Sequence, residues 1–449
     1  MVEEILDRIE KKIISYRRDF HRFPEAAWTE FRTASIVAAE LTGLGYKLKA
    51  GREVINAEDR MGLPSREVLQ SHFMRAIEQG GDREFIELFK YGFTGLVGIL
   101  ERGEGPVVAF RFDMDGLDLV ESKNPEHRPF KEGFSSVNSG VMHACGHDTH
   151  TAVGLGIAEV LMDMKDSIHG TVKLIFQPAE EGVRGAKSMV SSGILDDVNY
   201  LIGHHISSKW KTGEIAPGMS GYFATQKFDA FFTGKSAHGG GKPEEGKNAL
   251  MAAASAVVNL YAIPRHSKGA TRVNVGKLIA GTGRNIICDR AHMVIETRGA
   301  NDEVSDYMYE KALQILKSSA MMHDCTVEIK NMGSAGSAES DKKLAERVEK
   351  IAAETGGFSF VSSAAEGGSE DFTYMMKRVQ EKGGLATNIG VGANLSGVAG
   401  KELLLRGHTP EFDIDEASFR STVKLLSLLA LDIFTEVSIN NTYVYSRDA

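Results

Sequence analysis

Three apolar, β-rich runs in the first half of the chain end directly on polar residues. The runs cover residues 107–112, 171–176 and 200–203. Helical patterns at residues 151–164 and about 185–191 separate them, so strand and helix alternate. This alternation predicts an α/β fold with a largely parallel sheet. Because ligands bind beyond the carboxyl ends of such strands, we expect the acidic and imidazole residues that follow the runs to share one edge of the sheet.

From about residue 223 the order of the predicted elements changes. Strands are predicted at residues 224–233, 272–280, 291–297 and 325–330, with helices at 248–261 and 303–321. The order β-α-β-β-α-β is that of a ferredoxin-like unit. A chain of 449 residues is also too long for one compact core. We therefore predict a discontinuous catalytic domain at residues 1–222 and 333–449, with an α+β domain inserted at residues 223–332.

The rest of the catalytic domain is mostly helical in pattern. Helices are predicted at residues 2–19, about 30–43, about 343–354 and about 415–437, and a strand at 386–391. A polar, helical insertion without a strand signal covers about residues 55–92, with helices at 66–79 and 82–90. A glycine-rich loop precedes His408. Ser369 is expected to be the N-cap of one more helix, because serine accepts hydrogen bonds from a first turn.

The composition excludes several classes of partner. A net charge of −9, without a basic stripe, argues against nucleic acid or an anionic membrane. No apolar run approaches the roughly 18 residues that span a bilayer, and the acidic, helical start is unlike a signal or transit peptide. The cysteines Cys145, Cys288 and Cys325 are too few for a disulfide framework, which fits a reducing compartment. We expect a cytoplasmic protein that acts on a small molecule.

Residues 142–148 hold a thiol and two imidazoles within a very short segment. Cys145 and His147 are separated only by Gly146, and in an extended or tightly turned backbone both side chains reach one ion. The alternative interpretation is a buried cysteine beside a surface histidine. Short motifs match by chance, so this segment alone does not decide between the two.

Glu180 and Glu181 follow the second strand. Adjacent carboxylates repel each other, so a cation or a shared proton is expected nearby; the alternative is two solvated glutamates in the first turn of a helix. The thiol and imidazole segment upstream, with His204 and His205 downstream, favours a metal site. The residues alone do not choose between His204 and His205 as the ligand.

In combination these stretches resemble the M20 metallopeptidase family, in the amidohydrolase branch that includes aminoacylase-like and auxin-conjugate hydrolases. The matching stretches are residues 111–117, 142–148, 176–182, 234–238, 368–372 and 408–413, which together extend over most of the chain. Within that branch the chain is most similar to p-aminobenzoyl-glutamate hydrolases. That likeness rests on residues 16–21, the insertion that opens at Gly51, and residues 296–300.

The resemblance implies two divalent metal ions per chain and a general base, Glu180. The implied ligands are Cys145, His147, Glu181, His205 and His408. The family points to manganese, whereas a thiolate with three imidazoles would also suit zinc. Two such ions lower the pKa of a bridging water and polarise an amide carbonyl, while a carboxylate that is not a ligand carries the proton.

Further site residues also follow from the resemblance. Asp115 is implied to orient the metal ligands; its other interpretation is an aspartate that forms the turn before Gly116. His150 is interpreted as a histidine at a helix start that makes a structural hydrogen bond. The final motif departs from the family, since Thr409 stands where relatives commonly have asparagine, so we expect His408 to remain a ligand with different hydrogen bonding near it.

Three residues of the inserted domain complete the candidate site. The resemblance implies that His238 reaches an active site, often that of a dimer partner, and donates to the oxyanion of the tetrahedral intermediate. Asn285 and Arg298 are candidates for binding the carboxylate of the substrate, because the planar guanidinium suits it. Arg298 could equally form a structural salt bridge.

The expected function is hydrolysis of the amide that joins an aryl or acyl group to an amino acid, with p-aminobenzoyl-glutamate as the expected substrate. The inserted domain is expected to act as a lid and as the surface of a homodimer. One alternative is an aminoacylase-type hydrolase of other N-acyl amino acids. Another is a non-catalytic partner with a structural metal site, since the likeness is to one component of a hydrolase that has a paralogous second subunit; retention of Glu180 argues against it.

Overall fold

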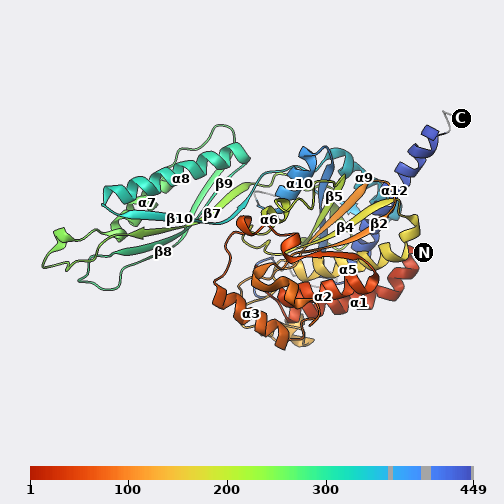
Figure 1. Cartoon of the computed structure of the whole chain (residues 1–449), viewed down its shortest axis with the longest axis horizontal. Helices are drawn as coiled ribbons and strands as arrows, with labels where there is room; N and C mark the ends of the chain where they lie inside the picture. The colour runs from red at the N-terminus through yellow and green to blue at the C-terminus, as the bar shows by residue number, and fades with distance from the viewer. Residues whose placement is uncertain (363–367, 396–405, 446–449) are drawn as a thin grey trace.

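The computed structural model describes residues 1–362, 368–395 and 406–445, and side chains only as far as residue 435. Residues 396–405 of the predicted glycine-rich loop lie outside the described residues. A large sheet flanked by helices forms the main body, and a smaller sheet with two helices projects from it (Figure 1). This arrangement confirms the predicted α/β class with a separate α+β part.

The large sheet has eight strands in the order β1-β2-β4-β3-β5-β12-β6-β11. The strands are β1 (Lys47–Ala50), β2 (Leu96–Arg102), β3 (Val107–Asp113), β4 (Gly170–Gln177), β5 (Tyr200–Lys211), β6 (Glu214–Ala216), β11 (Ser359–Phe360) and β12 (Leu385–Asn394). The central strands β4, β3, β5 and β12 are parallel, and antiparallel strands flank them, so the sheet is mixed and largely parallel. The sequence did not predict β1, β2, β6 or β11, because β1, β6 and β11 are very short and Gly98 interrupts the apolar run of β2.

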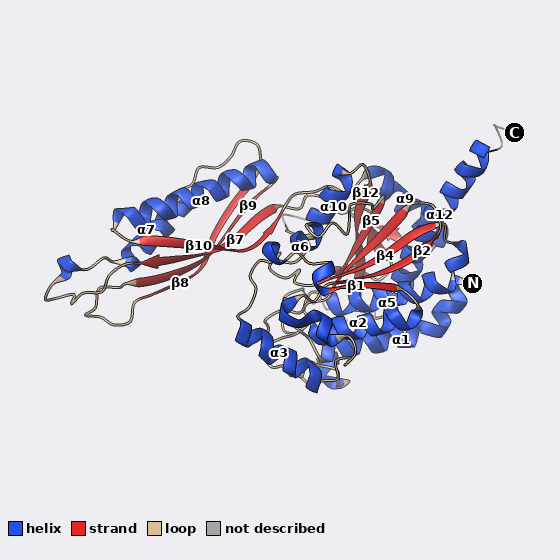
Figure 2. Ribbon diagram, in the orientation of Figure 1, coloured by secondary structure: helices blue, strands red, loops and turns tan. Residues whose placement is uncertain are grey.

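Helices cover both faces of the large sheet (Figure 2). The longer ones are α1 (Val2–Arg22), α2 (Phe31–Leu44), α5 (His147–Asp163), α9 (Lys342–Thr355) and α12 (Ser418–Tyr445). The shorter ones are α3 (Arg66–Glu78), α4 (Arg128–Lys131), α6 (Ala186–Val190) and α10 (Phe372–Glu381). Helix α5 packs closely between β3 and α1, and two glycines permit this approach. A Cβ on Gly154 would come within 2.7 Å of Phe112, and one on Gly156 within 2.7 Å of Ile13.

The insertion at residues 55–92, all of which are described, contains α3 and 3₁₀ segments and no strand, as the sequence predicted. The 3₁₀ segments of the chain are η1 (Gly51–Glu53), η2 (Ala57–Asp59), η3 (Ile86–Gly92), η4 (Lys165–Ser167) and η5 (Pro243–Glu245). The prediction of a helix at residues 82–90 is wrong. In its place stands η3, which contains a kink because Tyr91 has a φ of 65°.

The inserted part has a sheet of four antiparallel strands in the order β10-β7-β9-β8. Its elements are β7 (Ala224–Thr233), α7 (Ala249–Tyr261), β8 (Thr271–Ala280), β9 (Arg290–Gly299), α8 (Asp302–Met322) and β10 (Thr326–Ala335). β10 is longer than predicted, because it pairs with β7 beyond a bulge between Asn331 and Gly333. A hydrophobic core of its own fills this part, separate from that of the main body. These two cores support the domain division at residues 222/223 and 332/333 that we propose.

Two local predictions near the site are corrected by the structure. Strand β5 does not end before His204 but runs on to Lys211, because it pairs with β12 along its length. Ser369 is not an N-cap: α10 begins after Asp371, and the Ser369 hydroxyl donates instead to the backbone oxygen of Phe223 at 2.7 Å. Among the described helices, none is both long enough and apolar enough to span a bilayer.

Candidate metal and catalytic centre

The candidate site lies where β3 and β4 end. Residue Arg111 of β3 pairs with Gly203 of β5, so His204 and His205 stand level with the carboxyl end of β3 although β5 continues. Cys145 and His147 reach the same edge from the segment that starts α5. Gly146, the residue before this helix, has a φ of 96°, a left-handed conformation that favours glycine. The predicted clustering at one edge of the sheet is therefore observed.

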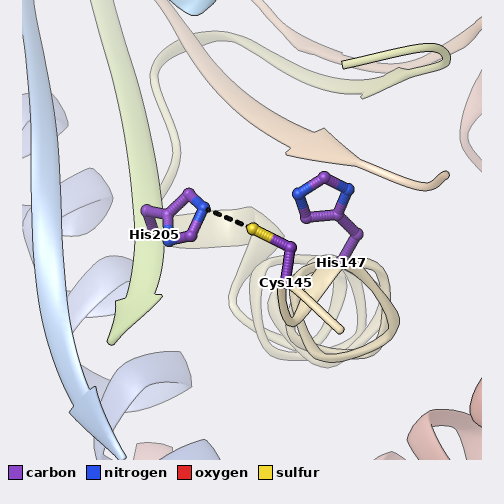
Figure 3. A group of neighbouring side chains, drawn as sticks. All are labelled: Cys145, His147 and His205. Carbon is purple, nitrogen blue, oxygen red and sulfur yellow. Dashed lines mark hydrogen bonds between the residues drawn. The ribbon is translucent and has the colours of Figure 1, made fainter. Parts of the chain in front are cut away.

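Cys145, His147 and His205 converge on one point (Figure 3). Their ligand atoms all lie within 4.8 Å of one another, and Sγ of Cys145 is 3.5 Å from Nε2 of His205. Nδ1 of His205 donates to the backbone oxygen of Ile206 at 2.7 Å, and Nδ1 of His147 donates to that of Asp115 at 2.8 Å. Both imidazoles thus keep the Nε2 lone pair for another partner, and Nε2 of His147 is buried without a hydrogen bond to any described residue.

A second group shares the thiol of Cys145 with Glu181 and His408. His408 has a φ of 62°, and its backbone N–H donates to the oxygen of Ala144 at 2.7 Å, which ties the two segments together. Nε2 of His408 lies 3.6 Å from Oε1 of Glu181, an oxygen that is buried and has no hydrogen bond within the described chain. Thr409 closes this turn, since its hydroxyl donates to the backbone oxygen of Arg406 at 2.7 Å.

The segment with Glu180 and Glu181 is held by Asp115. The two carboxylate oxygens of Asp115 accept the backbone N–H groups of Glu180 at 2.9 Å and Glu181 at 2.8 Å. The Glu180 carboxylate lies 3.9 Å from Nε2 of His147. Asp115 therefore orients both glutamates as well as His147, which goes beyond a role in the turn before Gly116 alone.

Carboxylates dominate the electrostatics of the site. Burial raises the pKa of Glu180 well above its ordinary value, and the carboxylates of Glu370 and Glu181 add to this effect. Burial opposes the imidazolium of His147, but the carboxylate of Asp113 and the contact with Asp115 outweigh it and raise its pKa. The site thus favours a bound cation. Together with the ligand atoms that have no partner among the described residues, this charge fits divalent metal ions.

His204 and His205 take different roles because neighbours along a strand point to opposite faces. Burial and the nearby ring of His150 lower the pKa of His205 to about 3, so its imidazole is neutral. His204 is buried on the other face against Phe112, with the ring centroids 5.7 Å apart. The structural interpretation of His150 is confirmed: its Nε2 accepts the N–H of Ile206 at 2.9 Å.

Sequence reasoning missed a buried ionic cluster beside the site. Arg111 donates to Gln177 at 2.8 Å, to Glu370 at 3.0 Å and to Asp371 at 3.2 Å, and also contacts Asp113. All these groups are buried, so the guanidinium neutralises carboxylates that lie next to Glu180. The signal that could have revealed it is a charged residue in the middle of an apolar strand.

A cleft of about 830 Å³ opens onto Cys145, His205 and His408. Its other lining residues include aromatic and apolar groups and two cations: Ile206, Trp210, Met219, Tyr222, Phe412, Lys209 and Arg406. The indole of Trp210 packs onto the backbone of β12 at Gly390. Glycine is needed there, since a Cβ on this residue would come within 2.4 Å of the indole. The cleft therefore offers flat apolar walls next to the candidate ligands.

The structure does not bring the three inserted-domain residues together in one chain. Nε of Arg298 donates to Glu296 at 3.0 Å, and Nη1 of Arg298 lies 3.4 Å from Oγ of Ser369. His238 and Asn285 line another cavity, which is built from inserted-domain residues. It lies near η5, at the end of this domain that is remote from the large sheet (Figure 1). Nδ1 of His238 accepts the N–H of Gly241 at 2.9 Å, so Nε2 carries the proton.

Comparisons with known proteins agree with this geometry. The model of peptidase family M20/M25/M40 matches residues 109–432. The chain is 45% identical to indole-3-acetyl-aspartic acid hydrolase of Enterobacter agglomerans, over 96% of this chain and 98% of the relative. It is also 45% identical to one of the subunits of p-aminobenzoyl-glutamate hydrolase from Escherichia coli, with the same coverage. The crystal structure of an aminobenzoyl-glutamate utilization protein from Klebsiella pneumoniae is similar with a TM-score of 0.83 and 39% identity, over 96% of this chain and 98% of that one.

Proposed function

We propose a function from one premise: the chain belongs to peptidase family M20/M25/M40 and is an amidohydrolase of that family. The observation that carries the proposal is the convergence of five candidate ligand side chains, in two groups that share the thiol of Cys145, with buried ligand atoms that have no partner among the described residues. We assign Cys145, His147 and His205 to one divalent ion, and Cys145, Glu181 and His408 to a second. Manganese is the metal we expect, with zinc as the alternative.

Such ions would lower the pKa of an attacking water and polarise the amide carbonyl. The chain's own residues carry the proton. Glu180 is not needed as a ligand in either group, and its raised pKa suits a carboxylate that takes a proton from water and returns it to the leaving nitrogen. Asp115 holds the backbone of both glutamates through hydrogen bonds to their N–H groups. This contact lets Glu180 act as the base while Glu181 binds metal.

For the substrate we propose an aromatic acyl group joined to a dicarboxylic amino acid, and p-aminobenzoyl-glutamate in particular. The two relatives at 45% identity are named for indole-3-acetyl-aspartate and p-aminobenzoyl-glutamate, which share this chemistry. The walls of Trp210, Tyr222 and Phe412 suit a flat aryl group, and Arg406, which also lines the cleft, suits a carboxylate. Hydrolysis of aliphatic N-acyl amino acids is the alternative.

We further propose a homodimer through the inserted domain. Strand β8 is at the edge of its sheet, and Leu278 and Ile279 on it are exposed, as are Met251 and Val258 of α7. An edge strand with exposed apolar residues is suited to pairing with a second copy. In such a dimer Nε2 of His238 would reach the partner's site and donate to the oxyanion, with Asn285 beside it. Arg298 would bind the substrate carboxylate on release from Glu296.

One relative is named as a single component of a larger hydrolase, which raises the alternative of a paralogous second subunit. The test is to remove metal from the purified chain, restore manganese or zinc, and measure hydrolysis of p-aminobenzoyl-glutamate, indole-3-acetyl-aspartate and N-acetyl amino acids. We expect metal-dependent release of the aryl acid, and loss of it in Glu180→Gln. Absence of turnover, with or without a paralogous partner, would refute the catalytic proposal. Preference for N-acetyl substrates would refute the aryl specificity alone.

A further inference from the structure

Three consecutive backbone N–H groups before and within the Glu180–Glu181 pair are held by two buried carboxylates. Glu30 accepts the N–H of Ala179 at 2.8 Å, while Asp115 accepts those of Glu180 and Glu181. Glu30 comes from the start of α2, about 150 positions away in the chain and outside the residues that the family model matches. No motif in the sequence connects it to the site.

The conformation of Ala179 makes this contact consequential. Ala179 has a φ of 56°, in the left-handed region that residues with a Cβ disfavour. It stands directly before Glu180 in the turn after β4, so its backbone angles set the direction in which the Glu180 side chain points. A strained residue persists only where its surroundings hold it in place. The hydrogen bond from the N–H of Ala179 to Glu30 is one of the contacts that hold this residue.

Glu30 is itself rigidly placed. It is fully buried, and it also accepts the N–H of Trp28 at 3.1 Å and the hydroxyl of Thr94 at 2.6 Å. Trp28 likewise has a left-handed φ, of 67°, and its indole donates to the backbone oxygen of Met61 at 2.8 Å. The carboxylate thus joins two strained residues from distant segments into one unit.

A role confined to helix α2 does not account for this arrangement. Glu30 occupies the N-cap position, yet its side chain makes no capping hydrogen bond to this helix, all of whose residues are described. The N-terminus of α2 is instead served by Glu25, whose carboxylate accepts the N–H groups of Arg32 at 3.0 Å and Thr33 at 2.9 Å. Glu25 therefore caps the helix, whereas Glu30 binds the backbone of the segment that carries Glu180.

We infer that Glu30 is a positioning residue, which holds the Ala179 peptide so that Glu180 points at the substrate amide. The inference rests on the proposed function of Glu180 as general base. Glutamine at position 30 can preserve the arrangement, because its oxygen accepts the same N–H groups and its amide can donate to Thr94. Burial, with the nearby carboxylate of Asp115, raises the pKa of Glu30 to about 8, so an uncharged side chain is tolerated there.

The test compares Glu30→Ala, Glu30→Gln and the matched control Glu25→Ala in the metal-loaded enzyme, with kcat, KM, thermal midpoint and amide hydrogen exchange of the peptide that contains Ala179. We expect Glu30→Ala to lower kcat about 10- to 100-fold, with KM little changed and faster exchange of that peptide. Glu30→Gln should restore most of kcat. Glu25→Ala should lower the thermal midpoint but leave kcat and the exchange unchanged. If Glu30→Ala does not fold, Thr94→Val takes its place, because it removes one hydrogen bond to Glu30. We expect Thr94→Val to lower kcat measurably, but by less than about 10-fold.

A wild-type kcat in Glu30→Ala, or an equal loss in Glu25→Ala, would overturn the inference. An inactive wild-type enzyme would instead refute the proposed function, and the exchange measurement would still decide whether Glu30 holds the peptide. If exchange near Ala179 rose equally in both alanine variants, Glu30 would have only a general structural role.

Discussion

The backbone oxygen of Asp115 accepts a hydrogen bond of 2.8 Å from Nδ1 of His147. The carboxylate of the same aspartate accepts the N–H groups of Glu180 and Glu181. One residue thus fixes the tautomer of a proposed metal ligand and the backbone of the proposed base. Such supporting contacts decide how well a site is preorganised.

Asp115→Asn should therefore weaken metal binding. The amide of asparagine presents an NH₂ group where two carboxylate oxygens now accept N–H groups, so one of these contacts is lost. We expect the affinity for manganese or zinc to fall about 10- to 100-fold, as measured by calorimetry. Asp118→Asn, at an exposed neighbour, is the control and should bind metal as the wild type does. Equal affinities for both variants would contradict the role of Asp115.

Glu180→Gln separates catalysis from metal binding. Glutamine keeps the size of the side chain but cannot carry a proton between water and the leaving nitrogen. We expect kcat to fall about 10²- to 10⁴-fold, with metal content unchanged by elemental analysis. Glu181→Gln should instead lose metal. Hydrolysis at the wild-type rate in Glu180→Gln would exclude it as the base.

Arg17→Met tests a buried ionic network that supports the segment after His147. The Arg17 guanidinium is buried and donates to Asp148 at 2.9 Å and to Asp413 at 2.7 Å, so its removal leaves buried carboxylates without a cation. We expect the free energy of unfolding to fall by about 3–5 kcal/mol in urea denaturation. Arg8→Met, which breaks an exposed pair with Asp163, should cost at most about 1 kcal/mol. A similar small cost for both would show that the network is not needed for stability.

The same network predicts a loss of stability in acid. Burial opposes ionisation of Asp413, but Arg17 and Arg128 outweigh it and lower its pKa to about 2 from an ordinary 3.8. A lowered pKa contributes stability that is present above 3.8 and is lost as the pH falls through 2. Denaturation at a series of pH values should show this slope, and Asp413→Asn should flatten it. An unchanged slope in the variant would assign the acid sensitivity to other groups.

Mixed dimers test the proposed contribution of His238 to a partner's site. His238→Ala and Glu180→Gln should each be inactive alone. In a mixed dimer one site combines an intact Glu180 with His238 from the other chain, so a refolded equal mixture should regain about one quarter of wild-type activity. No recovery in dimers that are shown to be mixed would place His238 in the site of its own chain or outside catalysis.

Local pattern was sufficient for most of the fold. Apolar runs, helical spacing and the changed order after residue 223 predicted the parallel centre of the large sheet and the separate four-stranded sheet, because both depend on periodicity within short segments. The edge strand β1 and strand β2 escaped prediction. Their short or interrupted apolar runs become strands only through pairing with neighbours.

The sequence by itself determined which residues could bind metal, since the spacing of Cys145 and His147 is visible in the chain and the family resemblance extends the set to Glu181 and His408. Only the tertiary structure decided what supports them. Arg111 and Glu30 act across more than a hundred residues, and whether His204 or His205 faces Cys145 depends on the register of β5. The physical reason is that a ligand's identity is a covalent property, whereas its direction and charge state depend on contacts that exist only once distant segments are packed together.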